Sequence, residues 1–322
     1  MEHKPAQNSS PLVSVIVPTF NRRAWIEVCL DSILEQSYPK IEIIVVDDGS
    51  NDGTAEWIRS KREYAGVTVH VQENSGASVA RNNGIKLATG ELIVFIDSDD
   101  MLLPNHIEKA VGVFNEFPET GIFCCDSRMI DTDGAVLFDG ATWHQNLSSI
   151  KKLRIESGFR PLEDVFRFSN CFPGFTLRRE VFDELGGFDQ SIFPADDYDL
   201  ALRVAGSRWK VFYLHEPLCL RREHDGQCSG IQNSVKTCRK LTEALNRVLA
   251  ENPELLRDRA LVNSRLGEIE LELGMSQIKE GGTASGLKTM AKSMIRDPQQ
   301  AGRIAGIGSR KLKNLAFGEK IK

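Results

Sequence analysis

The stretch Ile41-Glu42-Ile43-Ile44-Val45-Val46-Asp47-Asp48-Gly49-Ser50 places a run of β-branched residues directly before a polar turn. Such a run predicts a buried strand, with the turn at its carboxyl end. Further apolar runs at 13–17, 68–71 and 92–96 predict neighbouring strands. Helical spacing of apolar residues predicts helices between the strands, over 25–34, 54–61 and 77–88. This alternation predicts an α/β fold whose mainly parallel sheet is covered by helices.

The pattern changes near residue 231. Before it, apolar runs and amphipathic segments alternate, whereas beyond it apolar residues recur at helical spacing alone. We therefore expect a flexible start over residues 1–10, an α/β domain over 11–230 and an all-helical extension over 231–322.

Composition restricts the class of protein. The chain has 322 residues, 41% of them hydrophobic and 26% charged, which excludes collagen-like and wholly disordered chains. Its formal net charge of −5 argues against a nucleic-acid binder. Residues 283–322, however, hold nine basic and two acidic residues. That basic end suggests peripheral membrane contact, a partner-binding surface or a homodimer formed through the C-terminal helices.

The chain offers no apolar stretch of the roughly 18 to 20 residues that a membrane-spanning helix needs. Its polar start also lacks the pattern of a signal peptide. We therefore expect a cytoplasmic protein, with the inner face of the membrane as a possible site of peripheral contact.

The seven cysteines are odd in number and scattered, and they form no Cys-x-x-Cys pair. His106, like most of the other histidines, has no partner at a spacing that indicates zinc. These features favour reduced thiols over a disulfide framework or a structural zinc site.

Three of the predicted strands end in acidic or polar segments: Pro18-Thr19-Phe20-Asn21, Asp47-Asp48-Gly49-Ser50 and Asp97-Ser98-Asp99-Asp100. The carboxyl ends of parallel strands meet at one edge of a sheet, so these residues should lie close together. Clustered carboxylates repel one another, and a divalent cation with a preference for oxygen ligands relieves that repulsion. The sequence thus predicts an Mg²⁺ or Mn²⁺ site. Each motif taken alone also fits a tight turn or a helix cap.

Six blocks of the sequence together resemble the inverting family 2 glycosyltransferases, which have the GT-A fold. The blocks are 13–21 (VSVIVPTFN), 45–54 (VVDDGSNDGT), 76–84 (GASVARNNG), 95–100 (FIDSDD), 186–189 (GGFD) and 196–200 (DDYDL). They follow the order of the family over residues 11–230 and leave the helical extension uncovered. The resemblance implies a GT-A domain, a Rossmann-like mixed sheet flanked by helices, that binds a nucleotide-sugar.

The resemblance also implies roles for individual residues. Pro18, Thr19 and Asp48 match residues that contact the nucleoside, with Asp48 facing the base imide, which favours uridine. Arg81 matches a basic residue near the base and the phosphates. In the Asp97-Ser98-Asp99 motif, the first aspartate matches the one near the ribose and the second matches the metal ligand, while Asp100 is an ambiguous neighbour. Ser98 is grouped with the donor-contacting residues.

The second half of the domain should supply the base and a further metal residue. Asp197 matches the carboxylate that removes a proton from the acceptor hydroxyl. The sequence leaves open whether Asp196 or Asp197 has this role, and whether the pair merely caps a helix. His224 resembles a late histidine that approaches the diphosphate or metal, and the neighbouring Arg221 and Arg222 are candidate phosphate contacts.

The implied activity is inverting transfer of a sugar from a UDP-sugar to a hydroxyl of a glycan or lipid-linked saccharide, in polysaccharide or cell-envelope glycan synthesis. The alternative is a non-catalytic protein that binds a nucleotide-sugar as a scaffold of a glycan-assembly complex. A nucleotidyltransferase fits less well because the chain has no Gly-x-x-x-x-Gly-Lys phosphate loop.

Overall fold

The structure is a computed structural model that describes residues 10–138, 142, 156–167, 174–224, 226 and 234–302. Residues 1–9 of the predicted flexible start and residues 303–322 of the basic end lie outside this range. The chain divides into two compact units, Met1–Gln227 and Cys228–Lys322, each described here by itself.

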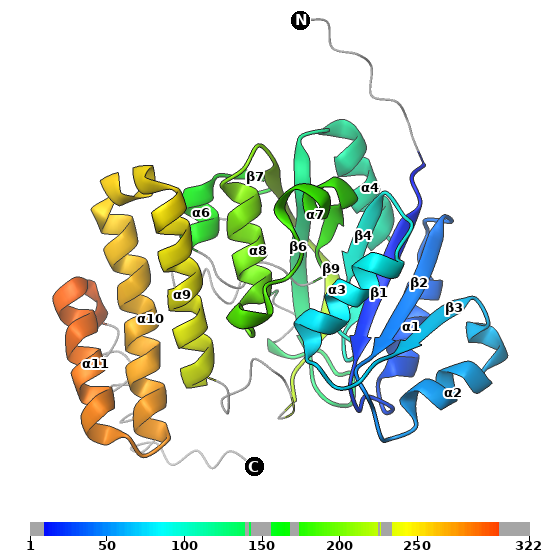
Figure 1. The fold of residues 1–322 in the computed structure, drawn as a ribbon, viewed down its shortest axis with the longest axis horizontal. Coiled ribbons are helices and arrows are strands. Elements are labelled where there is room, and N and C mark those ends of the chain that lie inside the picture. The colour runs from blue at the N-terminus through cyan, green and yellow to red at the C-terminus, as the bar shows by residue number, and fades with distance from the viewer. Residues whose placement is uncertain are drawn as a thin grey trace, which may run out of the picture. The chain divides into compact units, whose positions relative to one another are not determined.

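The first unit is built on a mixed sheet that contains nine strands in the described part of the chain (Figure 1). The strands are β1 (Val13–Thr19), β2 (Ile41–Asp47), β3 (Val67–Val71), β4 (Leu92–Phe95), β5 (Met101–Leu102), β6 (Thr120–Ile130), β7 (Gly158–Arg160), β8 (Thr176–Arg178) and β9 (Lys210–Arg222). Their order is β3-β2-β1-β4-β8-β6-β9-β5, and β7 pairs with β9. Strands β1 to β4 are parallel, as are β6 and β9, whereas β8 runs antiparallel to β4 and β6.

Helices cover both faces of this sheet (Figure 1). They are α1 (Ile26–Leu34), α2 (Thr54–Ser60), α3 (Ala77–Leu87), α4 (His106–Glu116), α6 (Leu162–Arg167), α7 (Arg179–Leu185) and α8 (Asp196–Ala205). Buried residues of α1 and α4 share one core cluster with Val15 and Phe123. On the other face, a Cβ at Gly84 of α3 would lie only 2.4 Å from Ile16 Cγ2. Burial on both faces explains why the strands are apolar without alternation, and the predicted α/β class is confirmed.

In its described part, the second unit contains three α-helices, α9 (Ser234–Glu251), α10 (Arg259–Lys279) and α11 (Thr283–Arg296), which lie side by side (Figure 1). Small residues allow α10 and α11 to pack closely, since a Cβ at Gly274 would lie 2.5 Å from Met290 Cγ. Ser293 Oγ donates to the Gly267 carbonyl at 2.6 Å. The predicted all-helical extension is therefore confirmed. Among the described residues, none of the helices combines the length and the apolar character needed to cross a membrane.

The topology brings the polar motifs together. Strand β1 lies between β2 and β4, parallel to both, so the three strands end at the same edge of the sheet. Asp48 N donates to the Thr19 carbonyl at 2.8 Å, which joins the ends of β1 and β2. The turn at 97–100 follows the end of β4. A hydrogen bond from Asp100 N to the Asp97 carbonyl, at 3.0 Å, closes this turn.

Candidate functional site

Three carboxylates gather in the turn after β4. One oxygen each of Asp97, Asp99 and Asp100 lies within 4.8 Å of the others. Burial and the charges of Asp99 and Asp97 raise the pKa of Asp100 well above its ordinary value. The like charges and the burial thus outweigh the opposing charge of Arg221 at Asp100. A set of hard oxygen ligands at this spacing fits Mg²⁺ or Mn²⁺.

Asp99 lies beside the two side chains most relevant to such a site. His224 Nε2 lies 2.9 Å from Asp99 Oδ2, and Arg22 Nε lies 3.1 Å from the same oxygen. The His224 side chain is 5% exposed and packs on Trp25, with ring centroids 4.4 Å apart. The structure thus brings together the two predicted metal residues, Asp99 and His224, from segments 125 residues apart.

Arg81 connects the acidic turn to the start of α8. Its guanidinium lies 3.0 Å from Asp97 and 3.2 Å from Asp196. Burial opposes the charge on this guanidinium, but the charges of Asp97 and Asp196 outweigh it and raise the pKa of Arg81. The side chain is therefore a permanent cation between the acidic turn and the predicted base, where a diphosphate group would need positive charge.

The first turn of α8 holds three aspartates in different surroundings. Asp196 is 2% exposed and accepts hydrogen bonds from Ser78 Oγ at 2.7 Å and from Arg81. Asp199 pairs with Arg203 at 2.9 Å. Among the described residues, Asp197 accepts a hydrogen bond only from the adjacent Tyr198 N, at 2.7 Å. Asp197 is thus the aspartate of this turn whose carboxylate forms no hydrogen bond with another side chain of the described residues.

The surroundings of Asp197 also suit proton transfer. Burial and the negative charge of Asp196 raise the pKa of Asp197, and Arg81 partly opposes them, so that it settles at about 6. A carboxyl group with this pKa is ionised at neutral pH and is a stronger base than an ordinary aspartate.

The predicted nucleoside residues lie at the ends of β1 and β2. Pro18 and Thr19 are buried at the end of β1. The Asp48 carboxylate accepts hydrogen bonds from Gln72 Nε2, Ser75 N and Gly76 N, at 2.7 to 2.8 Å. Asp48 therefore closes the loop before α3. Among the described residues, no hydrogen bond joins Pro18, Thr19 or Asp48 to the acidic turn. Ser98 is buried within that turn.

Two arginines at the site have contacts that sequence reasoning missed. Arg22 follows β1, so its place after a strand end could have revealed it; it pairs with Asp99 and donates to the Gly226 carbonyl at 2.9 Å. Arg222 is 4% exposed, and its guanidinium donates to the carbonyls of Asp99, Asp131 and Thr132. Arg222 therefore supports the acidic turn through buried backbone contacts, in place of the phosphate contact predicted for it.

A cleft of about 660 Å³ opens beside Asp99. Its walls come from 21–25, Asp52, His224 and Gly226. Since His224 and Arg22 both contact Asp99, the cleft gives a ligand access to the predicted metal residues.

Comparison with known proteins agrees with this geometry. The family model described as glycosyl transferase family 2 matches residues 14–186, more than half of the chain. The chain belongs to this family. The glycosyl transferase family 2 assignment confirms the resemblance found in the six sequence blocks.

Curated relatives support the assignment to glycosyl transferase family 2. An uncharacterised glycosyltransferase of Rickettsia typhi is 32% identical over 224 residues, which are 68% of this chain and 66% of that protein. The putative teichuronic acid biosynthesis glycosyltransferase TuaG of Bacillus subtilis is 46% identical over 112 residues, which are 34% of this chain and 44% of TuaG. The chain therefore spans about two thirds of the first relative and under half of the second.

Solved structures show the same fold at low sequence identity. The Mannosyltransferase PcManGT of Pyrobaculum calidifontis, solved with GDP-Man and Mn²⁺, aligns with a TM-score of 0.60 and 22% identity over 98% of this chain and 90% of that one. TarS residues 1–349 of S. aureus, solved with UDP-GlcNAc, align with a TM-score of 0.57 and 18% identity, over 90% of this chain and 92% of that one.

Proposed function

We propose that the protein transfers a sugar, with inversion, from a UDP-sugar to a hydroxyl of a glycan or lipid-linked saccharide. The observation that carries this proposal is the convergence of Asp97, Asp99, Arg81 and Asp197 at one edge of the sheet, in a chain of glycosyl transferase family 2. The name of TuaG supports a role in polysaccharide or cell-envelope glycan synthesis.

The donor half of the proposed site lies at the ends of β1, β2 and β4. We assign the nucleoside to Pro18, Thr19 and Asp48, and the ribose side to Asp97 and Ser98. Solved relatives hold UDP-GlcNAc in one case and GDP-Man in another. A uridine nucleotide is the better fit with the sequence, and a donor panel that includes GDP-sugars tests that choice.

Asp99 and His224 are the proposed ligands of a divalent cation. His224 lines the cleft, and its Nε2 atom lies 2.9 Å from Asp99 Oδ2. When bound, Mn²⁺ or Mg²⁺ would supply positive charge that stabilises the departing diphosphate. Arg81 supplies a second positive charge to the same group, because its guanidinium stays protonated.

Asp197 is the proposed base. In a direct displacement, the acceptor oxygen forms a bond to the anomeric carbon while the bond from that carbon to the diphosphate breaks. The acceptor proton passes to the Asp197 carboxylate. Asp196 and Asp199 are held by Arg81 and Arg203, so they serve the fold of α8 instead.

A further proposal concerns the basic end of the chain, part of which lies outside the described residues. We assign the basic end to peripheral contact with the inner face of the membrane, where a lipid-linked acceptor would be found. A homodimer through the C-terminal helices is the alternative role of that unit. Binding to anionic vesicles and the mass in solution distinguish the two.

The test is slow hydrolysis of nucleotide-sugars by the purified protein, with Mn²⁺, with Mg²⁺ and with chelator. We expect release of UDP from one donor, dependent on the metal, and a loss of about 10²- to 10⁴-fold in Asp197→Asn. Analysis of the product by NMR should show the inverted anomer. Donor binding without turnover, even with candidate acceptors, would favour the scaffold role.

A further inference from the structure

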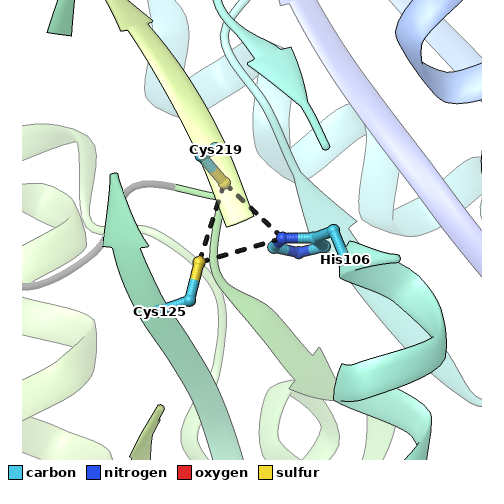
Figure 2. Close-up of side chains that lie close together, drawn as sticks. All are labelled: His106, Cys125 and Cys219. Atoms are coloured by element: carbon cyan, nitrogen blue, oxygen red, sulfur yellow. Dashed lines mark hydrogen bonds between the residues drawn. The ribbon is translucent and has the colours of Figure 1, made fainter. Parts of the chain in front are cut away.

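A histidine and two cysteines meet in the core of the sheet unit (Figure 2). They are His106 at the start of α4, Cys125 in β6 and Cys219 in β9, and all three are buried. The two sulfur atoms lie 3.7 Å apart, and His106 Nδ1 lies 3.8 Å from Cys125 Sγ and 3.5 Å from Cys219 Sγ. His106 thus has two partners in space that its sequence spacing did not reveal.

These distances match the edges of a metal site. A tetrahedral zinc ion has bonds of about 2.3 Å to sulfur and about 2.0 Å to nitrogen. Tetrahedral angles then place two ligand sulfurs about 3.8 Å apart, and a sulfur and a nitrogen about 3.6 Å apart. The three observed separations lie close to these values.

Two thiols and an imidazole form a ligand set that zinc prefers. Cysteine binds a metal ion as the thiolate, so the ion would displace the thiol protons when it binds.

Within the described part of the chain, the His106 ring lacks a strong hydrogen-bond partner. His106 Nε2 is buried, and within the described part of the chain it has no hydrogen-bond partner, so the only polar contacts of the ring are the two sulfurs. Sulfur is a weak donor and acceptor, and a buried imidazole is costly without good partners. A Cβ at Gly174 would lie 2.3 Å from Cys219 Sγ, so the backbone closes the cluster on that side.

We propose that His106, Cys125 and Cys219 bind a structural Zn²⁺ ion. A water molecule or another side chain would complete its coordination. The ion would fasten α4, β6 and β9 to one another under the acidic turn, because Cys219 pairs with Leu102 just beyond Asp100. This site differs from the proposed donor-metal site in its ligands, since two soft sulfur atoms stand where the donor site offers the hard carboxylate of Asp99.

The first measurement is the metal content of the full-length protein, purified without a metal-binding tag. We expect about one zinc per chain by inductively coupled plasma mass spectrometry. Replacement of the metal by Co²⁺ should give the near-ultraviolet absorption of thiolate-to-cobalt charge transfer. The Co²⁺ spectrum needs no variant, so it decides the question even if the ligand variants fail to fold.

Variants then locate the ion. Cys125→Ser, Cys219→Ser and His106→Gln should each bind zinc at least about tenfold more weakly. Cys124→Ser is the matched control, because Cys124 is a buried neighbour that donates to the Phe212 carbonyl instead. Asp99→Ala should keep its zinc, which separates this site from the donor site.

Three outcomes would overturn the proposal. In the first, the wild-type protein takes up no zinc from added Zn²⁺ and shows no thiolate absorption with Co²⁺. In the second, all three ligand variants retain zinc. In the third, mass spectrometry of the unreduced protein finds a disulfide between Cys125 and Cys219.

Discussion

Two adjacent aspartates in the first turn of α8 have different hydrogen-bond partners. Asp196 and Asp197 are adjacent in sequence, and from sequence either could be the base. Ser78 and Arg81 bind Asp196, whereas Asp197 accepts a hydrogen bond only from its own helix among the described residues. This difference comes from α3, a helix more than 100 residues away in the chain, so no local pattern predicts it.

The neighbouring charge of Asp196 predicts a specific pH dependence. Because the pKa of Asp197 is about 6, the fraction of ionised base falls as the pH drops below 6, and kcat/KM should fall with it. Asp196→Asn removes the negative charge that helps to raise this pKa. The acid limb of kcat/KM against pH should therefore move to lower pH, by about one unit.

The control for this shift is Asp183→Asn, which changes an exposed carboxylate of α7. Its profile should match that of the wild type. An acid limb at the same pH in Asp196→Asn and in the wild type would show that Asp197 does not set it.

Metal binding is predicted to depend on Asp99 and His224. Asp99→Ala and His224→Gln should each weaken Mn²⁺ binding about tenfold or more, because each removes a proposed ligand. Electron paramagnetic resonance of free Mn²⁺ measures this affinity directly. Asp133→Asn, in an exposed turn, is the control, and equal affinity in all four proteins would place the metal elsewhere.

At the scale of elements, one side chain joins two distant motifs. Asn82 of α3 accepts a hydrogen bond from Phe188 N at 2.9 Å and donates to the Phe188 carbonyl at 2.8 Å. A Cβ at Gly187 would lie 2.3 Å from Asn82 Oδ1, so glycine is needed there. The 76–84 and 186–189 blocks of the sequence are thus the two halves of one contact.

Loss of this contact should destabilise the fold. Asn82→Ala leaves two backbone groups of Phe188 without their partner, and we expect a loss of about 1 to 3 kcal/mol in the free energy of unfolding. Urea denaturation measures the loss. Asn83→Ala removes only side-chain contacts, with Gln72 and Lys86, and should cost less. An equal loss of stability in the two variants would mean that the Asn82 contact with the Phe188 backbone is not specially stabilising.

The elements of the parallel half were predictable, and those beyond were less so. Strands β1 to β4 and helices α1 to α3 begin and end close to the predicted ranges, because both faces of that sheet are covered and the apolar runs are unbroken. Strand β9 extends to Arg222, eight residues past the end of its unbroken apolar run at Leu214. His215, Glu216 and Pro217 interrupt its apolar pattern where the pairing with β6 shifts register.

At the scale of the whole molecule, long-range contacts limit what sequence alone predicts. The strand-end carboxylates were predictable, because parallel topology places strand ends together. Two other features were not predictable, because each joins segments with no shared local pattern. They are the support of the acidic turn by Arg222 and the cluster of His106 with Cys125 and Cys219.

The division into two units predicts independent effects of substitution. Gly274→Leu should force α10 and α11 apart, because even a Cβ there would lie 2.8 Å from the Gly286 carbonyl oxygen, and should cost about 1 to 3 kcal/mol of stability in the helical unit. Release of UDP by the sheet unit should not change. Thermal unfolding followed by circular dichroism, alongside the hydrolysis assay, measures both.

Ala291→Leu is the control, since residue 291 is exposed on α11. It should leave the unfolding transition in place. A fall in hydrolysis that parallels the loss of stability in Gly274→Leu would show that the two units act as one.

The acidic turn is fastened at both ends. Strand β4 precedes the turn, and β5, which pairs with β9, follows it. Arg222 donates hydrogen bonds to the Asp99 carbonyl and to the Asp100 carboxylate. Its backbone has therefore given up its conformational entropy during folding, before any donor arrives. Little of the donor's binding free energy is then consumed in ordering the turn. Replacement of Arg222 should therefore weaken donor affinity, although Arg222 has no proposed contact with the donor. The turn would be less ordered before binding, and part of the donor's binding free energy would be consumed in ordering it.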